Sequence, residues 1–469
     1  MAIPVTVIAG HGAHRSRSQG LTRQNADTPR LLGFRLPLPA GGRMPGVRSG
    51  EQQSSGLVRL AVVTVLVGLG AGVGGTCLAL LLHALQHLAY GYVGGSFTAG
   101  VTSAAWPRRL IVMAIAGLIA GFGWWAVYRF GRPLISIAKA VRSEDPRMPM
   151  LTTTCHALLQ IVTVALGSPL GREVAPREIG AMFAGWLTRR ARLTARECQI
   201  LVACGAGAGL AAVYNVPVGG AVFTLEVLLG TWSVRAVLPA VVTSVLATVI
   251  SWIGLPDTPQ YHLPDLTVGT SLAIWSVIIG PITGVVAHGF AKLAARARKS
   301  APHGRLIMLL APLAFLIAGA LSIAFPELLG NGKGPVQLAF DSRPILGVAV
   351  GLLVFRIVIV ALCLRGGAEG GLLTPSLANG ALMGVVLGGI WAAMWPGLSI
   401  GSCAIVGATA FLATSQRMPI TAVVLTVEFT NAPHQLLVPI LLAVAGAAAT
   451  GHLCERLATA RENAAVKTG

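Results

Sequence analysis

Two glycine-containing breaks in apolar sequence carry the residues best suited to binding a small anion. The first break reads GREVAP and begins with Gly171, Arg172 and Glu173, directly before an apolar run. The start of a helix offers unpaired N–H groups and a positive dipole end, and both attract anions. Glu173 is itself an anion, so its carboxylate can occupy such a site until protonation or displacement frees the site for a solute ion. In the alternative interpretation, Glu173 only stabilises the helix start and pairs with Arg172 or Arg177.

The second break, GGLLTP, supplies a matching helix start. Gly370 and Gly371 leave the backbone uncovered. Leu372 and Leu373 then open the next helix with free N–H groups, and Pro375 fits its first turn. This segment is either a second anion-binding helix start or a glycine-rich re-entrant loop that only packs. The first interpretation is favoured, because paired breaks in repeated halves indicate a transport site near the middle of a membrane.

A third break lies at 130–140 and reads FGRPLISIAKA. It places Arg132 between Gly131 and Pro133, before a short predicted helix. Arg132 is either a cation beside an anion path or a cytoplasmic surface charge, and the polar sequence that follows is consistent with the surface interpretation.

The two halves of the chain repeat one template. Residues 217–227 read PVGGAVFTLEV, and residues 419–429, which begin 202 positions later, read PITAVVLTVEF. The GREVAP and GLLTP breaks are separated by nearly the same distance. Each repeat carries one carboxylate after a long apolar run, Glu226 and Glu428. Glu226 is either part of a proton path or a cap on a neighbouring helix terminus, and the symmetric placement favours the cap.

The composition predicts an all-α multi-pass membrane protein. Hydrophobic residues make up 54% of the chain and charged residues only 11%, with a mean hydropathy of +0.74; soluble domains carry roughly a quarter charged residues. The 58 glycines fit close helix packing in lipid. The net charge of +19 does not indicate nucleic acid, because the basic residues lie in short connections and tails, as in cytoplasmic loops. Apolar stretches long enough to cross a bilayer lie at 57–82, 108–128, 233–253, 345–364 and 436–451.

The chain shows no signature of an enzyme, a cofactor or a metal site. Its seven cysteines have no CxxC spacing and lie mostly in apolar runs, which predicts buried thiols without a disulfide framework. HExxH, GxSxG and P-loop motifs are absent from the sequence.

The chain is expected to divide into an arm, a membrane domain and a tail. Residues 1–55 are basic and rich in Gly, Pro and Ser, which predicts a disordered cytoplasmic arm; Met44 is an alternative start. The membrane domain is expected at 56–457, with halves at about 57–253 and 268–455 and a proline-rich extramembrane connection between them. Pieces such as 371–380 look too short to cross alone. Residues 458–469 are expected to form a short cytoplasmic tail.

The order and spacing of four segments resemble the CLC family of chloride channels and chloride/proton exchangers. The segments are GREVAP, GGLLTP, GAGAGLAAVYNVPVGGAVFTLE at 205–226 and GATAFLATSQRMPITAVVLTVEFT at 407–430. The resemblance covers about 57–455. It implies two inverted repeats with many tilted and broken helices, and a homodimer with one pathway per subunit. It also implies that Glu173 is the gating glutamate and that the N–H groups of Leu372 and Leu373 hold a central anion.

Several positions depart from the family pattern. Arg132 stands where the family has an anion-coordinating serine, and Ser136, one helical turn further on, is a possible substitute. His434 aligns with an anion-binding tyrosine and can donate an N–H to an anion. Val227 stands at the internal proton-transfer glutamate of the exchangers. Val174 replaces a usual glycine in the anion-binding loop and is expected to stiffen it.

The sequence therefore predicts transmembrane transport of chloride or a related small anion, gated by Glu173. The valine at the proton-transfer position favours a channel or an uncoupled pathway. The alternative is a chloride/proton antiporter with a non-standard internal proton route, through Glu226 or water, and a further alternative is a membrane scaffold that transports nothing. The expected partners are the anion, protons in the exchanger case, membrane lipid and a second copy of the chain, and no nucleic acid. The expected location is a bacterial inner membrane, with gating by voltage or by pH left open.

Overall fold

The computed structural model describes residues 48–143, 145–264 and 266–468. Contacts divide the chain into Met1–Gln52, of which only the first residues of the first helix are described, and Gln53–Gly469, which contains everything discussed below. The predicted disordered arm at 1–47 lies outside the described residues.

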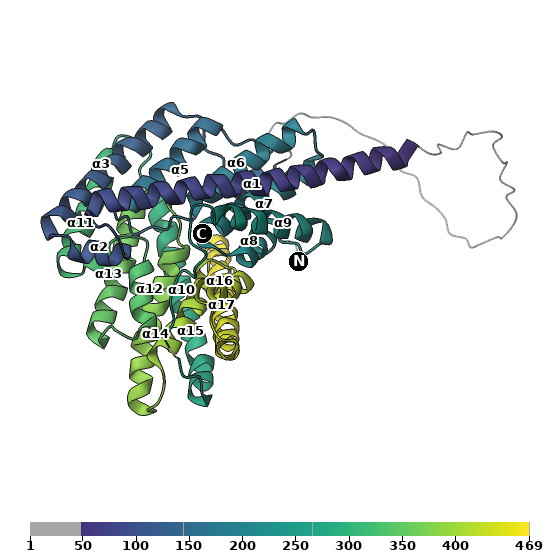
Figure 1. The fold of residues 1–469 in the computed structure, drawn as a ribbon. Helices are drawn as coiled ribbons and strands as arrows, with labels where there is room; N and C mark the ends of the chain where they lie inside the picture. Colours follow the sequence, from purple (N-terminus) through teal and green to yellow (C-terminus); the bar gives the residue numbers. More distant parts are fainter. Residues whose placement is uncertain (1–47, 144, 265, 469) are drawn as a thin grey trace, which may run out of the picture. The chain divides into compact units, whose positions relative to one another are not determined.

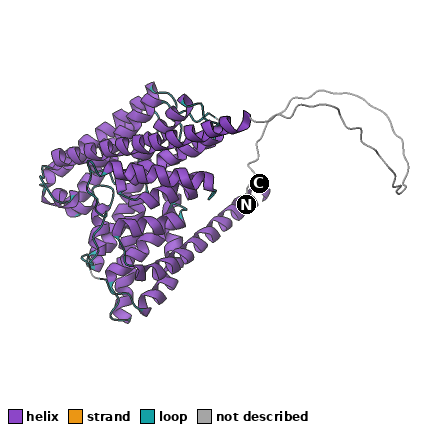
Figure 2. Cartoon of the chain, turned by 45° about the vertical axis from the view of Figure 1, so that its right-hand side comes forward, coloured by secondary structure: helices purple, strands orange, loops and turns teal. Residues whose placement is uncertain are grey.

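The described part of the chain is helical, and Figure 2 shows helices joined by short loops without a strand. In the first half the helices are α1 (Arg48–Tyr90), α2 (Phe97–Ser103), α3 (Trp106–Phe130), α4 (Ile137–Arg142), α5 (Met150–Ala165), α6 (Val174–Arg190), α7 (Ala195–Tyr214), α8 (Pro217–Phe223), the π-helix η1 (Thr224–Leu229) and α9 (Val234–Ser251). In the second half they are α10 (Thr270–Lys299), α11 (Ile307–Ala324), the 3₁₀ turn η2 (Pro326–Leu328), α12 (Lys333–Phe340), α13 (Leu346–Arg365), α14 (Leu373–Met394), α15 (Ile400–Ser415), α16 (Pro419–Thr430), the 3₁₀ turn η3 (His434–Leu436) and α17 (Leu437–Thr468).

Within the described residues, nine helices are long and apolar enough to cross a membrane. They include helices over all five of the stretches that the sequence predicts to be long enough. The prediction of an all-α, multi-pass membrane protein is therefore confirmed. Shorter apolar helices such as α5, α8, α15 and α16 lie between the long ones.

The two halves use the same devices to stop and restart a helix. Asn215 and Arg417 both have left-handed backbone angles, with φ of 57° and 54°. Each lies two residues before the proline that opens the next helix, Pro217 in α8 and Pro419 in α16. A left-handed residue cannot continue an α-helix, and a proline is tolerated in the first turn of a new one. The chain therefore turns at equivalent positions of the two repeats.

Paired glycines bring neighbouring helices into backbone contact in both halves. α6 crosses α7 at Gly180 and Gly205, and α14 crosses α15 at Gly380 and Gly407, and Figure 1 shows α14 beside α15. A Cβ added to Gly380 would lie 2.5 Å from the carbonyl oxygen of Gly407, and one added to Gly407 would lie 2.6 Å from that of Gly380. Helices in lipid associate through such small residues. These crossings hold the starts of α6 and α14 in place.

We expect Gly180→Ala and Gly380→Ala to destabilise the protein by about 1–3 kcal/mol each, because the new methyl group forces two packed helices apart. Thermal unfolding of the purified protein in detergent measures the effect. Gly289→Ala is the matched control, since nothing lies within 4 Å of its added Cβ in α10 and alanine is the better helix former. Equal unfolding temperatures for all three variants would contradict this account of the crossings.

The structure differs from the sequence-based boundaries in three places. α1 begins at Arg48, inside the segment predicted to be disordered, and α17 continues to Thr468, through the predicted tail. Four of the twelve residues at 458–469 are alanine, the strongest helix former. The piece at 371–380 is not short, because α14 runs on to Met394 and its glycines pack against α15 instead of ending the helix.

The seven cysteines are unpaired, and their burial follows the prediction only in part. Cys198, Cys204, Cys363 and Cys403 are buried. Cys155 and Cys454 are half-buried, and Cys77 is exposed on α1, so an apolar neighbourhood in the sequence does not by itself place a thiol in the core.

The proline-rich connection between the halves is packed against the second half. The N–H of Tyr261 donates to the carbonyl oxygen of Phe429 at 2.9 Å, and the Tyr261 ring is 3% exposed. The Gln337 side chain exchanges two hydrogen bonds with the backbone of His262. The connection thus fixes α16 and α12 relative to the end of the first half.

Candidate functional site

The two glycine breaks meet in the folded chain. The N–H of Gly171 donates to the carbonyl oxygen of Gly371 at 2.7 Å, and the N–H of Gly371 donates to that of Gly171 at 2.8 Å. α6 begins three residues after Gly171 and α14 begins two residues after Gly371. The amino ends of both helices therefore point into one region from opposite halves of the chain, as the repeat spacing predicts.

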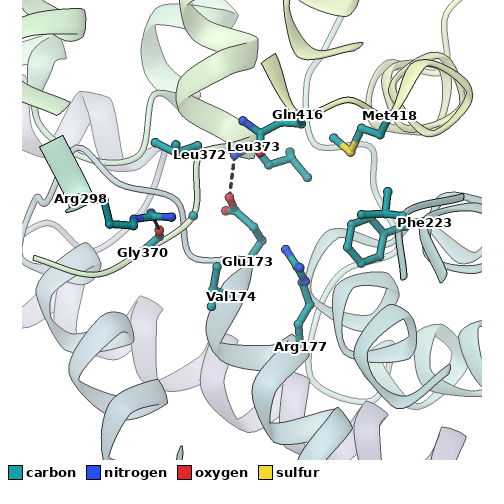
Figure 3. A pocket seen from close by; sticks show the side chains of 12 residues that line it. Glu173, Val174, Arg177, Phe223, Arg298, Gly370, Leu372, Leu373, Gln416 and Met418 are labelled. Carbon is teal, nitrogen blue, oxygen red and sulfur yellow. Dashed lines mark hydrogen bonds between the residues drawn. The ribbon is translucent and has the colours of Figure 1, made fainter. Parts of the chain in front are cut away.

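The Glu173 carboxylate fills this meeting point. Its side chain is buried, with 1% exposure. Oε1 accepts a hydrogen bond from the N–H of Leu373 at 2.7 Å, and Oε2 accepts one from the Tyr214 hydroxyl at 3.3 Å. Tyr214 also contacts the Thr374 hydroxyl at 3.1 Å. Figure 3 shows the carboxylate directed at the start of α14. Glu173 from one repeat thus caps the helix that opens the site in the other.

A cavity of about 230 Å³ lies beside this carboxylate. Two cations reach it from different helices, Arg177 on α6 and Arg298 on α10 (Figure 3). The Arg177 guanidinium lies 4.5 Å from the centre of the Phe223 ring. Arg298 donates to the carbonyl oxygen of Gly370 at 2.8 Å, and 44% of its side chain is exposed. The remaining lining residues are Val174, Val227, Gly371, Leu372, Leu373, Gln416 and Met418. The cavity therefore joins a buried carboxylate to a partly exposed guanidinium, which is an electrostatic setting for an anion.

The structure brings part of the predicted anion-binding set to this cavity. Val174, Leu372 and Leu373 line it, and Gly171 forms the backbone bridge behind it. Arg172 does not line the cavity. It is 8% exposed and stacks 5.1 Å from the centre of the Tyr214 ring, next to Glu173.

Arg132, Ser136 and His434 do not reach the cavity. The Arg132 side chain is exposed, and its backbone N–H donates to Thr152. Ser136 is the N-cap of α4, and its hydroxyl accepts the N–H of Lys139. His434 is exposed in η3. Arg132 matches the family's serine when the chain is counted without gaps from Glu173, and Ser136 is its substitute one turn on; both lie exposed before α4. These three residues do not line the Glu173 cavity, and their contact with an anion stays a prediction.

Glu226 and Glu428 cap each other's repeats. Glu428 accepts the N–H groups of Val218 at 2.9 Å and Gly219 at 2.6 Å, at the start of α8. Glu226 accepts those of Ile420 at 3.0 Å and Thr421 at 2.6 Å, at the start of α16. Both oxygens of each carboxylate bind free N–H groups at a helix start, so the structural interpretation of this pair holds. A proton path through Glu226 stays a prediction, and its carboxylate is held by backbone donors of α16.

The structure adds Tyr214, Arg298 and Gln416 to the site, and it places Arg177, named from the sequence only as a pairing partner of Glu173, in the cavity lining. Arg177 lies four positions after Glu173 in one helix, and this spacing puts two side chains on one face, so the sequence did contain a signal for it. Tyr214 lies inside the family-like segment 205–226, but no sequence spacing relates it to Glu173. Arg298 and Gln416 come from distant helices, and no local spacing connects them to Glu173.

We expect Tyr214→Phe to raise anion flux by about two- to tenfold, because the variant removes one hydrogen bond that holds the Glu173 carboxylate in place. Anion efflux from liposomes measures it. Tyr128→Phe is the matched control, since the Tyr128 hydroxyl donates to Glu369 and not to Glu173. A flux equal to that of the unchanged protein would show that Tyr214 does not restrain Glu173.

The fold and the site define a multi-pass membrane protein whose two related halves direct broken helices at one buried carboxylate. The profile of the family described as Voltage gated chloride channel matches residues 116–452. The chain therefore belongs to the CLC family.

Known relatives agree with this assignment. The chain is 30% identical over 399 residues to the voltage-gated ClC-type chloride channel ClcB of Escherichia coli, covering 82% of this chain and 93% of the relative. Among solved structures, a slow cyanobacterial Cl⁻/H⁺ antiporter matches with a TM-score of 0.74 at 21% identity, over 84% of this chain and 95% of that one. A CLC-type fluoride/proton antiporter matches with a TM-score of 0.63 at 20% identity, over the same shares. These two structures share the fold.

Proposed function

We propose that the protein transports chloride or a related small monovalent anion across a membrane, through a pathway that passes the Glu173 carboxylate. One observation carries the proposal: an anionic side chain already occupies the N–H donor at the start of α14. A donor that holds a carboxylate at 2.7 Å can hold a halide after the carboxylate leaves. Relatives described as chloride channels and as halide/proton antiporters support the substrate class.

Glu173 is the gate in this proposal. Its carboxylate and the anion compete for the same donors, so an anion passes when Glu173 is displaced or protonated. A protonated carboxyl is a weaker acceptor for the Leu373 N–H than a carboxylate. Anion flux is therefore expected to rise as pH falls. Arg177 and Arg298 raise the local anion concentration in the cavity.

An uncoupled pathway is the favoured form of this transport. Val227 lines the cavity and carries no titratable group, and Glu226 is held by the backbone of α16. The runner-up is a chloride/proton antiporter; the two structural neighbours are described as a Cl⁻/H⁺ antiporter and a fluoride/proton antiporter. In that case protons reach Glu173 through water in the cavity.

The test measures chloride and proton flux together, on purified protein in liposomes. We expect chloride efflux that depends on the protein, with a reversal potential set by chloride alone. Proton uptake driven by a chloride gradient would establish the antiporter. Chloride efflux equal to that of protein-free liposomes would refute transport and leave the membrane scaffold. In the same proposal the protein is a homodimer in a bacterial inner membrane and catalyses no chemical reaction.

A further inference from the structure

A fully buried arginine lies outside the Glu173 cavity without an adequate partner. Arg356, in the middle of α13, is 0% exposed. Its only hydrogen bond runs from Nη1 to the carbonyl oxygen of Leu328 at 3.5 Å, the limit of a hydrogen bond. Nε and Nη2 have no acceptor among the described residues. Arg356 also takes part in none of the ion pairs or cation–π contacts found in that part of the chain. A buried charge without a partner costs several kcal/mol.

The guanidinium faces the start of a helix, which makes its surroundings more positive. Gly332 is the N-cap of α12 and has a φ of 112°. A Cβ added to Gly332 would lie 2.7 Å from Arg356 Nη2, so the absence of a side chain leaves the guanidinium against the backbone of the helix start. The first turn of α12 contains no acidic residue and begins with Lys333, a cation where a carboxylate is favoured. The buried guanidinium therefore faces the positive end of a helix dipole, with no acidic residue in the first turn of α12.

The other buried arginines show that this arrangement is unusual in the chain. Arg109 is 8% exposed, and its Nη1 donates to the carbonyl oxygen of Ser322 at 2.8 Å. Arg172 is also 8% exposed and lies over the Tyr214 ring, next to Glu173. Each of these two buried arginines has a close carbonyl oxygen or an aromatic ring as a partner. Arg356 has only the long bond to Leu328.

We propose that Arg356 and the amino end of α12 bind a small monovalent anion, such as a halide, at a second site distinct from the Glu173 cavity. The anion accepts hydrogen bonds from Nε or Nη2 of Arg356 and faces the positive end of α12. The anion is singly charged because the site supplies one fully buried cation. It is small because the backbone is close on the other side: a Cβ added to Gly332 would lie 2.8 Å from the Cβ of Ala378. None of the cavity-lining residues belongs to this site.

The second anion stabilises the seam between three helices of the second half. Arg356 comes from α13, Gly332 from the start of α12, and Ala378 from α14, five residues after Leu373. Neutralising the guanidinium removes the cost of burying it at this seam. The folded protein is therefore expected to bind the anion more tightly than the unfolded chain, and its stability should depend on anion concentration. This inference does not depend on transport through the Glu173 site.

Bromide gives a direct test, because it scatters anomalously. Crystals of the full chain grown or soaked in bromide should show an anomalous peak within hydrogen-bonding distance of Arg356 Nε or Nη2, resolved from any peak at Leu373. A bromide map without a peak at Arg356, or with a water there, would overturn the proposal. This experiment uses the unchanged protein, so it is decisive even if variants fail to fold.

Thermal unfolding supplies the second readout. Replacing gluconate by chloride at constant ionic strength should raise the unfolding temperature of the purified protein by about 3–5 °C at saturation. Arg356→Met keeps the volume and removes the charge, so it should lose most of that shift, whereas Arg109→Met should keep it. If Arg356→Met retains the full shift, the chloride-dependent stability arises elsewhere and the proposed site is wrong.

Discussion

Replacing Glu173 with alanine should increase anion flux by about tenfold or more at neutral pH and make the flux independent of pH. The carboxylate holds the Leu373 N–H at 2.7 Å in a buried position, and a charge-assisted hydrogen bond of this kind contributes about 1.5–3 kcal/mol. Removing the carboxylate removes its binding free energy at this donor, and each 1.4 kcal/mol of that energy corresponds to about a tenfold change in the apparent affinity of the site for the anion. Chloride efflux from liposomes between pH 5 and 8 measures both effects.

Two further variants make this result specific to the carboxylate. Glu173→Gln keeps the shape of the side chain and one carbonyl acceptor but cannot ionise, so its flux should also lose the pH dependence, with a smaller increase. Glu197→Gln alters an exposed capping glutamate at the start of α7, away from the site, and should leave flux and its pH dependence unchanged. If Glu173→Ala transports no faster than the unchanged protein at any pH, Glu173 does not compete with the anion.

Loss of either of the two carboxylates that cap the opposite repeat should lower the stability of the protein. We expect Glu428→Ala and Glu226→Ala each to lower the free energy of unfolding by about 2 kcal/mol, because each leaves two backbone N–H groups without an acceptor at a helix start. Unfolding in mixed detergent, followed by circular dichroism, measures the loss.

The double variant tests whether the Glu226 and Glu428 contacts are energetically coupled. Glu428 joins the end of α16 to the start of α8, and Glu226 joins η1 to the start of α16, so the two contacts tie the same segments together. The double variant should therefore lose a different free energy from the sum of the single losses. Glu197→Gln, in the exposed capping box of α7, should cost less than about 1 kcal/mol. If Glu226→Ala and Glu428→Ala each lose no more unfolding free energy than Glu197→Gln, the two carboxylate contacts do not stabilise the fold.

Much of the site was predictable because the two halves of the chain contain equivalent helix breaks. The GREVAP and GLLTP breaks lie at matching positions of the two halves, and their glycines and prolines mark helix starts by local backbone chemistry. The pairing of Gly171 with Gly371 and the proximity of Glu173 to Leu373 follow from bringing these two starts together. The matching positions of Glu226 and Glu428 likewise indicated a structural pair before their partners were known.

Alignment without geometry was less informative. Arg132, Ser136 and His434 are expected in the site from the family pattern alone, and in the structure all three are exposed and none lines the cavity. The direction of a side chain in a short loop depends on the turn that the backbone makes, and neither composition nor spacing specifies that turn. Tyr214 donates to Glu173 from a position that the sequence does not mark as a polar contact, whereas the spacing of four residues from Glu173 does indicate Arg177.

The sequence by itself determined that the chain crosses a membrane many times, that its halves are related, and where its helices break, because hydropathy, periodicity and backbone restrictions of Gly and Pro act over a few neighbouring residues. Only the tertiary structure decided which donors face Glu173, that Arg298 on α10 shares its cavity, and that Arg356 is buried against the start of α12 without a carboxylate. Those contacts join residues far apart in the chain, and they depend on how closely the glycine-lined helices approach one another. That approach is a property of packing in three dimensions and is not encoded at any single position.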